Sequence, residues 1–261
     1  MEGGGEAVCQ LVKGIHIVTP NKKFGAGPMD RYKALRASTD AMFMYEATCG
    51  AGLPVMSTLR SLIETGDTVL SVEGILSGSL SYIFNTYKSG MAFSSVVADA
   101  RARGYTEPDP REDLSGMDVA RKVVILAREC GMEVELSDLK VESLVPEALA
   151  KLANGDEYMA ALPQHDAEIG ALASQAAAEG KVIRYIGRVD AAAKTCSVEL
   201  TSVPKDHPFA QLSGADNLVV FTTERYKERP LIIRGPGAGA DVTAAGMFAD
   251  IVQIIKCSRK K

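Results

Sequence analysis

Residues 104–122, GYTEPDPREDLSGMDVARK, join a proline-rich loop to the start of a helix. Each proline pushes the residue before it out of the helical region, so Glu107 and Asp109 are expected on extended backbone in a non-helical TEPDPRED loop. In the helix that follows, Asp118 and Lys122 are four residues apart and therefore lie one above the other. The stretch thus places carboxylates on a stiffened loop next to a helical Asp–Lys pair.

Lys122 falls among aliphatic residues on the helical wheel, and partial desolvation lowers the pKa of a lysine and suits it to proton transfer. Asp118 acts in the opposite direction, because a neighbouring carboxylate favours the charged form. Taken alone, the two residues fit an ordinary surface ion pair worth ~0.3–0.5 kcal/mol. The whole stretch instead predicts a preorganised pocket for a small zwitterion, in which carboxylates bind an ammonium and the lysine faces a carbonyl or hydroxyl oxygen.

The composition is that of an ordinary globular protein. The 261 residues are 46% apolar and 24% charged, with a net charge of −4 and no Lys/Arg-rich block before the last three residues, so nucleic acid is not expected as a partner. No apolar run reaches the roughly 18 residues of a membrane span, and no signal peptide is recognised. The five cysteines form no CxxC pair, which favours free thiols in a reducing compartment. We expect a soluble intracellular protein, cytoplasmic or plastid, without a membrane partner.

Hydrophobic patterns predict an α/β fold with a mixed sheet covered by helices. Strands are predicted at residues 15–19, 41–47, 68–76, 182–189, 195–203, 217–226 and 230–234. The last four suggest an antiparallel sheet. The first has no earlier strand to pair with, although a parallel strand needs covered neighbours on both sides. The chain is therefore expected to begin with the end of an α/β domain.

Residues 235–240, GPGAGA, follow a predicted strand and open a helix. This is the context of a dinucleotide-binding turn, in which the helix N-terminus attracts phosphate. The pattern alone is weak, because a true fingerprint needs a second strand and an acidic residue ~20 positions further on. Tight helix–sheet packing by small residues is the alternative interpretation.

Two further stretches are candidates on chemical grounds. Glu46 precedes a glycine-containing turn, residues 48–53, whose carbonyl oxygens are suited to a hard cation. The alternative is a satisfied carboxylate at the end of a strand. Lys22, in TPNKK, follows the carboxyl end of a predicted parallel strand, where ligands bind in open α/β sheets. The alternative is a solvated loop lysine.

The chain resembles homoserine dehydrogenases of the plant and yeast type over nearly its whole length. The motifs that carry the resemblance are TPNKK, YEATCGAGLP, GILSGSLSYIFN, GYTEPDPREDLSGMDVARK, HPFAQLSGADN and GAGADVTAAG. The resemblance implies an oxidoreductase that reduces aspartate semialdehyde to homoserine with NADPH or NADH, on the route to threonine, methionine and isoleucine. It also implies a homodimer with a Rossmann domain, a dimerisation region and a catalytic α/β region.

The resemblance assigns roles that the residues alone left open. Lys122 matches the proton donor, and Lys22 matches a second lysine at the substrate and the nicotinamide. The substrate-binding positions match Glu107, Asp118, Asp113, Tyr105 and Ser79, the last of which is commonly threonine in the family. The monovalent-cation site, expected to hold Na⁺, matches Glu46 and the backbone carbonyls of Cys49, Ala51 and Leu53. Gly239 matches a contact to the cofactor.

The resemblance also implies a domain order. Residues 1–28 match the end of the nucleotide-binding domain, 29–230 the catalytic and dimerisation domain, and 231–261 a strand, loop and helix that return to the nucleotide-binding domain. Family members carry a strand and a GxGxxG motif well before TPNKK, so most of the Rossmann domain and its pyrophosphate and adenosine sites are expected to be absent. The alternatives are an inactive substrate-binding and dimerisation fragment, which would also pair with a full-length enzyme, and an amino-acid sensor.

Overall fold

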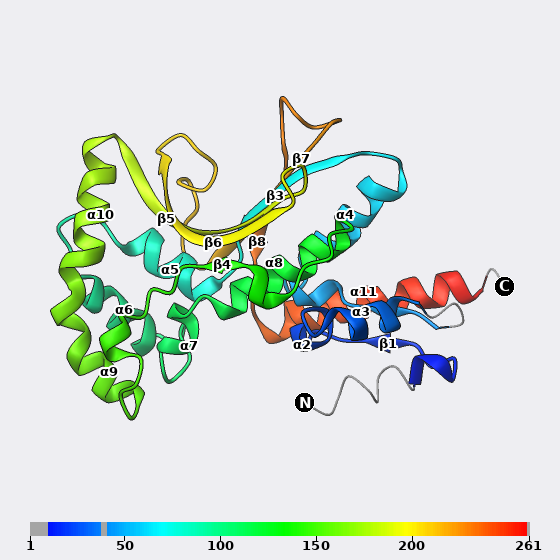
Figure 1. Cartoon of the computed structure of the whole chain (residues 1–261), viewed down its shortest axis with the longest axis horizontal. Helices are drawn as coiled ribbons and strands as arrows, with labels where there is room; N and C mark the ends of the chain where they lie inside the picture. Colours follow the sequence, from blue (N-terminus) through cyan, green and yellow to red (C-terminus); the bar gives the residue numbers. More distant parts are fainter. Residues whose placement is uncertain (1–9, 38–40, 260–261) are drawn as a thin grey trace.

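The computed structural model describes residues 10–37 and 41–259. Within them a six-stranded mixed sheet has the strand order β4-β6-β5-β3-β7-β8 (Figure 1). Its strands are β3 (Val69–Ile75), β4 (Lys140–Val141), β5 (Lys181–Asp190), β6 (Thr195–Pro204), β7 (Asp216–Thr223) and β8 (Leu231–Pro236). The expected α/β fold with a mixed sheet is confirmed.

The central strand of this sheet is β3, which pairs antiparallel with β5 on one side and with β7 on the other. The four strands predicted in the final third are all present, but β3 lies between β5 and β7. The sheet is mixed because the short edge strand β4 runs parallel to β6, whereas the other pairs are antiparallel. The carboxyl end of β3 therefore reaches the middle of the molecule, where Leu76 and the start of the next helix lie.

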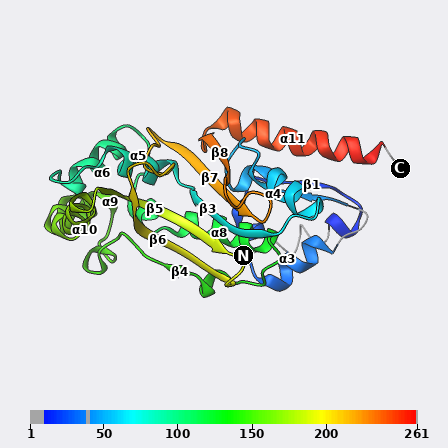
Figure 2. The ribbon, with the colours of Figure 1, turned by 90° about the horizontal axis from the view of Figure 1, so that it is seen from above.

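Helices cover one face of the sheet and bring the 104–122 stretch to it (Figures 1 and 2). The helices of this layer are α5 (Gly78–Thr86), α6 (Phe93–Ala102), α7 (Arg111–Leu114), α8 (Met117–Glu129), α9 (Gly155–Ala161) and α10 (Asp166–Ala178). Helix α8 comes closest to the sheet at Gly187, where an added Cβ would lie 2.6 Å from Val123 Cγ2. This close approach fixes the helix that carries Asp118 and Lys122.

The expectation that TEPDPRED contains no helix is wrong at its end. Residues Arg111–Leu114 form the short helix α7, with Pro110 as its N-cap residue. Proline has a fixed φ and lacks an N–H that a helix start would leave unpaired, so it suits the first turn of a helix. The remainder of the loop is non-helical, as predicted.

The N-terminal part packs against α8 from the other side. Strand β1 (Ile17–Val18) pairs parallel with β2 (Phe43–Met44), and helices α2 (Lys22–Gly25), α3 (Met29–Arg36) and α4 (Val55–Glu64) surround them. The sequence also predicts the end of an amphipathic helix at residues 6–13; residues 6–9 lie outside the described residues, whereas 10–12 are helical. The strand predicted at 41–47 is shorter than expected, because the chain turns into the 3₁₀ helix η1 (Glu46–Thr48). The remaining 3₁₀ helices are η2 (Leu136–Asp138), η3 (Glu147–Leu149) and η4 (Leu162–His165).

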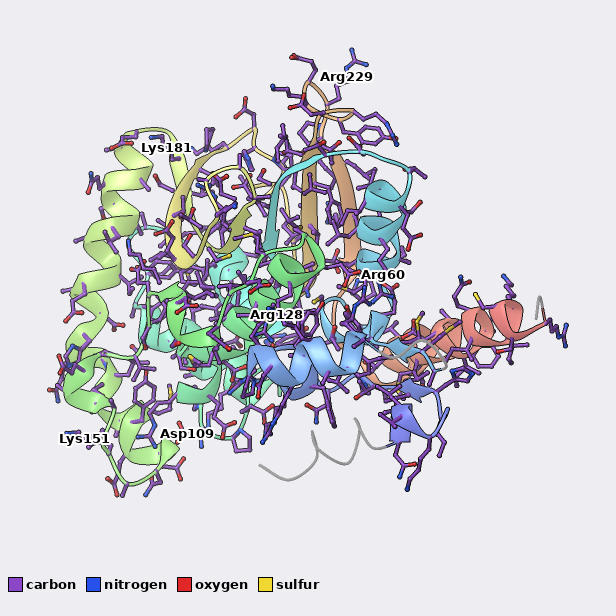
Figure 3. All side chains as sticks on the ribbon, turned by 45° about the vertical axis from the view of Figure 1, so that its right-hand side comes forward. Arg60, Asp109, Arg128, Lys151, Lys181 and Arg229 are labelled. Carbon is purple, nitrogen blue, oxygen red and sulfur yellow. The ribbon has the colours of Figure 1, made fainter. Side chains whose placement is uncertain are left out.

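Arg128, near the end of α8 and labelled in Figure 3, ties the N-terminal segment to that helix. Its buried guanidinium donates hydrogen bonds to the carbonyls of Gly25 (2.8 Å) and Gly27 (2.6 Å). Gly25 also lies close to α8, since a Cβ there would be 2.9 Å from Ile125 Cγ1. Helix α2 and Lys22 at its start are thus held over α8.

The last helix, α11 (Ala240–Ser258), runs outward to the C-terminal end of the molecule (Figures 1 and 2). It docks on the turn after β2 through small residues: a Cβ at Gly246 would lie 2.6 Å from the Ala51 carbonyl oxygen. The Asp250 carboxylate also accepts the Glu46 backbone N–H at 2.8 Å. In the described part of the chain, no helix has both the length and the apolar character needed to cross a membrane.

Candidate active site

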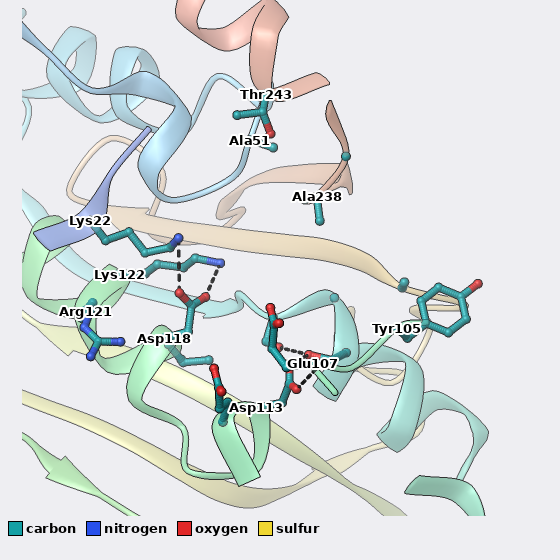
Figure 4. Close-up of a pocket in the computed structure, with 18 of the residues that line it drawn as sticks. Lys22, Ala51, Tyr105, Glu107, Asp113, Asp118, Arg121, Lys122, Ala238 and Thr243 are labelled. Atoms are coloured by element: carbon teal, nitrogen blue, oxygen red, sulfur yellow. Dashed lines mark hydrogen bonds and ion pairs between the residues drawn. The ribbon is translucent and has the colours of Figure 1, made fainter. Parts of the chain in front are cut away.

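A cavity of about 870 Å³ lies where α5, α7, α8, the turn after β2 and the start of α11 meet (Figure 4). Ligand sites for small molecules and cofactors are typically about 300–1,000 Å³. The described residues that line it include Lys22, Ala51, Ser79, Tyr105, Glu107, Asp113, Asp118, Lys122 and Gly239. Residues from five separate stretches of the sequence are therefore brought to one site.

The centre of the cavity wall is Asp118, which bridges two lysines (Figure 4). Its Oδ1 lies 3.2 Å from Lys22 Nζ, and its Oδ2 lies 3.0 Å from Lys122 Nζ. Burial alone would raise the pKa of the Asp118 carboxyl, but the ammonium groups of Lys122 and Lys22 outweigh it and hold that pKa below its ordinary value. Asp118 is therefore ionised at neutral pH.

Lys122 is the more deeply buried of the two lysines, with 8% of its side chain exposed. Its Nζ donates to the Leu76 carbonyl at the end of β3, at 2.6 Å, and to Asp118. An ammonium has three N–H donors, so one remains for an atom in the cavity. Lys22, with 28% of its side chain exposed, comes from helix α2 and lies beside Lys122 above Asp118 (Figure 4).

Asp113 organises the second acidic part of the wall. It accepts the Ser79 hydroxyl at 2.6 Å and the Glu107 backbone N–H at 2.8 Å, so each carboxylate oxygen has one partner. Ser77 joins the network through a 3.0 Å contact between its Oγ and that of Ser79. Within the described residues, the Glu107 side-chain carboxylate has no hydrogen bond or ion pair. Glu107 thus offers an unpaired carboxylate, while Asp113 serves to hold its backbone.

The opposite wall consists of small residues from the start of α11 and the turn after β2. The predicted strand-loop-helix context of the glycine-rich segment is present, since residues 237–239 separate β8 from α11 and Gly239 is the N-cap residue of that helix. No side chain fits at Gly237, because a Cβ there would lie 2.0 Å from Asn217 Nδ2. The wall offers backbone groups and the Thr243 side chain, without charged groups of its own.

Behind that wall lie Glu46 and the turn at residues 48–53, which the sequence predicts to bind a cation; we call this segment the cation turn. It exposes several oxygen atoms. Glu46 accepts the backbone N–H groups of Met56 (2.9 Å) and Ser57 (2.8 Å) at the start of α4, one on each carboxylate oxygen. The Leu53 carbonyl accepts the Val55 N–H at 2.8 Å, and no backbone N–H of the described residues bonds to the carbonyls of Cys49 or Ala51. Every one of these oxygens retains a lone pair for a cation.

The chemistry of this donor set is that of a hard cation held by one carboxylate and several carbonyls. No group of three or more His, Cys, Asp or Glu side chains in the described residues is arranged to hold a metal. The Cys49 thiol itself is unsuited to metal binding or catalysis, because burial raises its pKa to about 12. The residues therefore fit a hard cation bound by oxygen atoms and do not resemble a transition-metal site.

Sequence reasoning missed several residues that line the cavity. These are Ser77, Arg121, Asp216 and Thr243. Ser77 carries a recognisable signal, because a serine before a helix is a typical N-cap residue and its Oγ accepts the Leu80 N–H. Asp216 and Thr243 carry no local signal, since they reach the site only through the packing of β7 and α11, whereas Arg121 lies on α8 within the 104–122 stretch.

The fold and the site define a class of protein. An α/β domain with a lysine–carboxylate centre and an open carboxylate is suited to proton transfer on a small amino-acid-like substrate. The family model described as homoserine dehydrogenase matches residues 54–252. The chain belongs to the homoserine dehydrogenase family.

Similar proteins agree with this family. The fission yeast Schizosaccharomyces pombe homoserine dehydrogenase is 49% identical over 96% of this chain and 70% of its own length. The maize (Zea mays) chloroplastic bifunctional aspartokinase/homoserine dehydrogenase 2 is 59% identical over 94% of this chain, which spans 27% of that protein. The crystal structure of a Candida auris protein of unknown function has a TM-score of 0.92 and 47% identity, covering 97% of this chain and 73% of that one.

Proposed function

We propose that this chain carries the substrate-binding and catalytic site of a homoserine dehydrogenase. The reaction is the reduction of L-aspartate 4-semialdehyde to L-homoserine with NADPH or NADH, within the biosynthesis of threonine, methionine and isoleucine. The observation that carries the proposal is the Lys122 ammonium, which is buried, bonded to Asp118 and Leu76, and left with one N–H for the cavity.

Lys122 acts as the general acid of the reduction. Its remaining N–H donates to the aldehyde oxygen and transfers a proton as that oxygen gains charge, a contribution typically worth ~10²–10⁴-fold in rate. Asp118 keeps the ammonium in place, and the Leu76 carbonyl prevents it from rotating away from the cavity. In the reverse direction the same lysine accepts the hydroxyl proton of homoserine.

The acidic side of the cavity orients the substrate. Glu107 offers its unpaired carboxylate to the substrate ammonium, with Asp118 as the second acid and Asp113 as the residue that supports Glu107. Ser79 and Tyr105 complete this side of the cavity. Holding both ends of a short substrate fixes its orientation, which removes much of the entropic cost of the reaction.

The other side of the cavity suits a nicotinamide cofactor, which supplies the hydride. The fit rests on the size of the cavity, on the small residues around Gly239 and on Lys22 at its edge. Lys22 and Gly239 would hold the nicotinamide end. The Asp118–Lys22 ion pair keeps this lysine between the two halves of the site.

A monovalent cation, Na⁺ in our proposal, is held by Glu46 and the carbonyls of Cys49, Ala51 and Leu53. Ala51 both lines the cavity and contacts Gly246 of α11, so the cation would stiffen the turn on which α11 rests. Its role is therefore structural.

The domain boundaries at 28 and 230 and the homodimer also remain part of the proposal. In support of the homodimer, the helical layer covers one face of the sheet (Figure 1), and the opposite face is the surface that a second copy of the chain would use. The same face would allow a heterodimer with a full-length enzyme.

Isothermal titration of the purified chain with homoserine tests the proposal, together with NADP⁺- and NAD⁺-dependent oxidation of homoserine followed by absorbance. Saturable binding with turnover supports it, and binding without turnover assigns only the substrate-binding role. The matched variants are Lys122→Met, expected to remove turnover, and Lys23→Met, at the exposed lysine next to Lys22, as the control. Absence of homoserine binding to the wild-type chain would contradict the proposal.

A further inference from the structure

The loop that carries Glu107 begins on an aromatic pair at the edge of the substrate site. The ring of Tyr105 stacks on that of Tyr82 in α5, with 4.3 Å between centroids and 22° between planes. Tyr105 is 43% exposed, so little else covers its ring, and Figure 4 shows it at the far end of the cavity from Lys22. The Tyr105 N–H also caps α6 by bonding to the Ala100 carbonyl at 2.9 Å. Tyr82 is thus the platform on which the loop starts.

The last turn of α6 holds this platform. The Tyr82 hydroxyl donates to Asp99, and the Arg103 Nε lies 2.9 and 3.0 Å from the two oxygens of the same carboxylate. The hydrogen bond to Asp99 and partial burial raise the pKa of Tyr82, so its hydroxyl is a donor throughout the physiological range. Asp99 therefore determines where the Tyr82 ring lies.

The same helical turn also holds the loop beyond Glu107. The Arg101 Nε donates to the Pro108 carbonyl at 2.9 Å, and its Nη2 pairs with Asp156 at 2.7 Å. Asp99 and Arg101 lie two residues apart, so their side chains leave α6 in different directions. Arg101 bonds to the loop at Pro108, whereas Asp99 acts on its start through Tyr82. Glu107 is consequently bracketed on both sides by one helix end.

The contacts on both sides of Glu107 affect how its carboxylate meets the substrate. The Glu107 carboxylate has no partner among the described side chains, so its position is set by its backbone, through Asp113, and by the two ends of the loop. We propose that Tyr82, Asp99 and Arg101 are positioning residues that aim the Glu107 carboxylate at the substrate ammonium. They contact neither the substrate nor the reacting atoms. This inference rests on the proposed function and adds the determinants of selectivity for an amino acid.

The test compares homoserine with 4-hydroxybutanoate, which lacks only the amino group. For the wild-type chain, titration should show a large preference for homoserine. In Tyr82→Leu, which removes the platform, we expect homoserine binding to weaken by about tenfold or more, 4-hydroxybutanoate binding to change less than twofold, and the preference to collapse. Tyr82→Phe keeps the ring but loses the hydrogen bond to Asp99, so it should lower the preference less than Tyr82→Leu does, by about two- to fivefold. A general structural defect would weaken both ligands equally.

Asp99→Asn provides a second, milder variant, because it is exposed and conserves shape; it should reduce the preference by about two- to fivefold. The control is Lys181→Ala, which removes another exposed ion pair, with Glu179, far from the loop. Unchanged preference in both Tyr82→Leu and Asp99→Asn, with wild-type homoserine binding intact, would overturn the inference alone. A wild-type chain that does not bind homoserine would overturn the proposed function and the inference with it.

Discussion

The two walls of the cavity keep their shape by opposite means. The acidic wall is held by side chains, with Asp118 between two lysines and Asp113 between Ser79 and the Glu107 backbone. The glycine-rich wall is held by the lack of side chains, as at Gly246, where a Cβ would collide with a carbonyl oxygen. Changes of charge on the first wall therefore test chemistry and recognition. Changes of size on the second test placement.

The largest effect is expected from Lys122→Met on the acidic wall. Methionine fills a similar volume but cannot donate a proton, so kcat should fall by ~10²–10⁴-fold. Circular dichroism and the unfolding temperature should show that the fold is kept, because Asp118 retains its pairing with Lys22. A kcat equal to that of the Lys23→Met control would exclude Lys122 as the general acid.

The packing of α11 behind the glycine-rich wall can be tested with two helical glycines, Gly246 in α11 and, as a control away from the cavity, Gly170 in α10. Alanine at Gly246 would place a Cβ 2.6 Å from the Ala51 carbonyl oxygen, and overpacking of this kind costs about 1–3 kcal/mol. Alanine at Gly170 in α10 would meet only the Tyr87 hydroxyl at 3.9 Å and should stabilise the chain by about 0.5–1 kcal/mol.

Urea unfolding of both variants measures this difference. In Gly246→Ala, binding of Na⁺ should weaken as well, because the affected carbonyl belongs to the proposed cation turn. Equal stabilisation by the two substitutions would show that α11 does not rest on that turn.

The smallest effect concerns pH. Burial raises the pKa of the Asp250 carboxyl, the Glu46 N–H and Arg60 oppose this, and the Glu46 carboxylate adds to it. The folded chain therefore holds this proton more tightly than the unfolded chain, so the contribution of Asp250 to stability is present below its ordinary pKa and is lost as pH rises through the raised value.

Asp250→Asn should remove that part of the pH dependence, because the asparagine side chain does not titrate. Unfolding free energies of wild type and Asp250→Asn, measured from neutral pH down to about pH 4, give the difference directly. Parallel curves for the two proteins would show that Asp250 has the same pKa in both states.

The sequence predicted the acidic wall better than the rest, and the reason is locality. The Asp118–Lys122 contact follows from helical spacing, and the strands of the final third from alternating hydrophobicity. The insertion of β3 between β5 and β7 depends on pairing between distant segments, which no local pattern encodes. The strand predicted at 41–47 was too long. Tyr45, Glu46 and Thr48 are all buried, and a short buried run fits a strand or a tight helical turn equally well.

The candidate site shows the same difference between features that depend on local sequence and features that depend on long-range packing. Lys22 was placed near the substrate through the resemblance, but its ion pair with Asp118 joins residues that are far apart in sequence. The Tyr82–Tyr105 stack and the Asp99 contact were not foreseen, because each depends on how α5 and α6 cross. Long-range packing, and not residue chemistry, limits what the sequence reveals.

A crystal structure of the chain with bound homoserine tests the central claim most directly. The account predicts the homoserine hydroxyl within hydrogen-bond distance of Lys122 Nζ and the ammonium against the Glu107 carboxylate. Homoserine bound in the reverse orientation, with its ammonium away from Glu107 and its hydroxyl out of reach of Lys122, would contradict it.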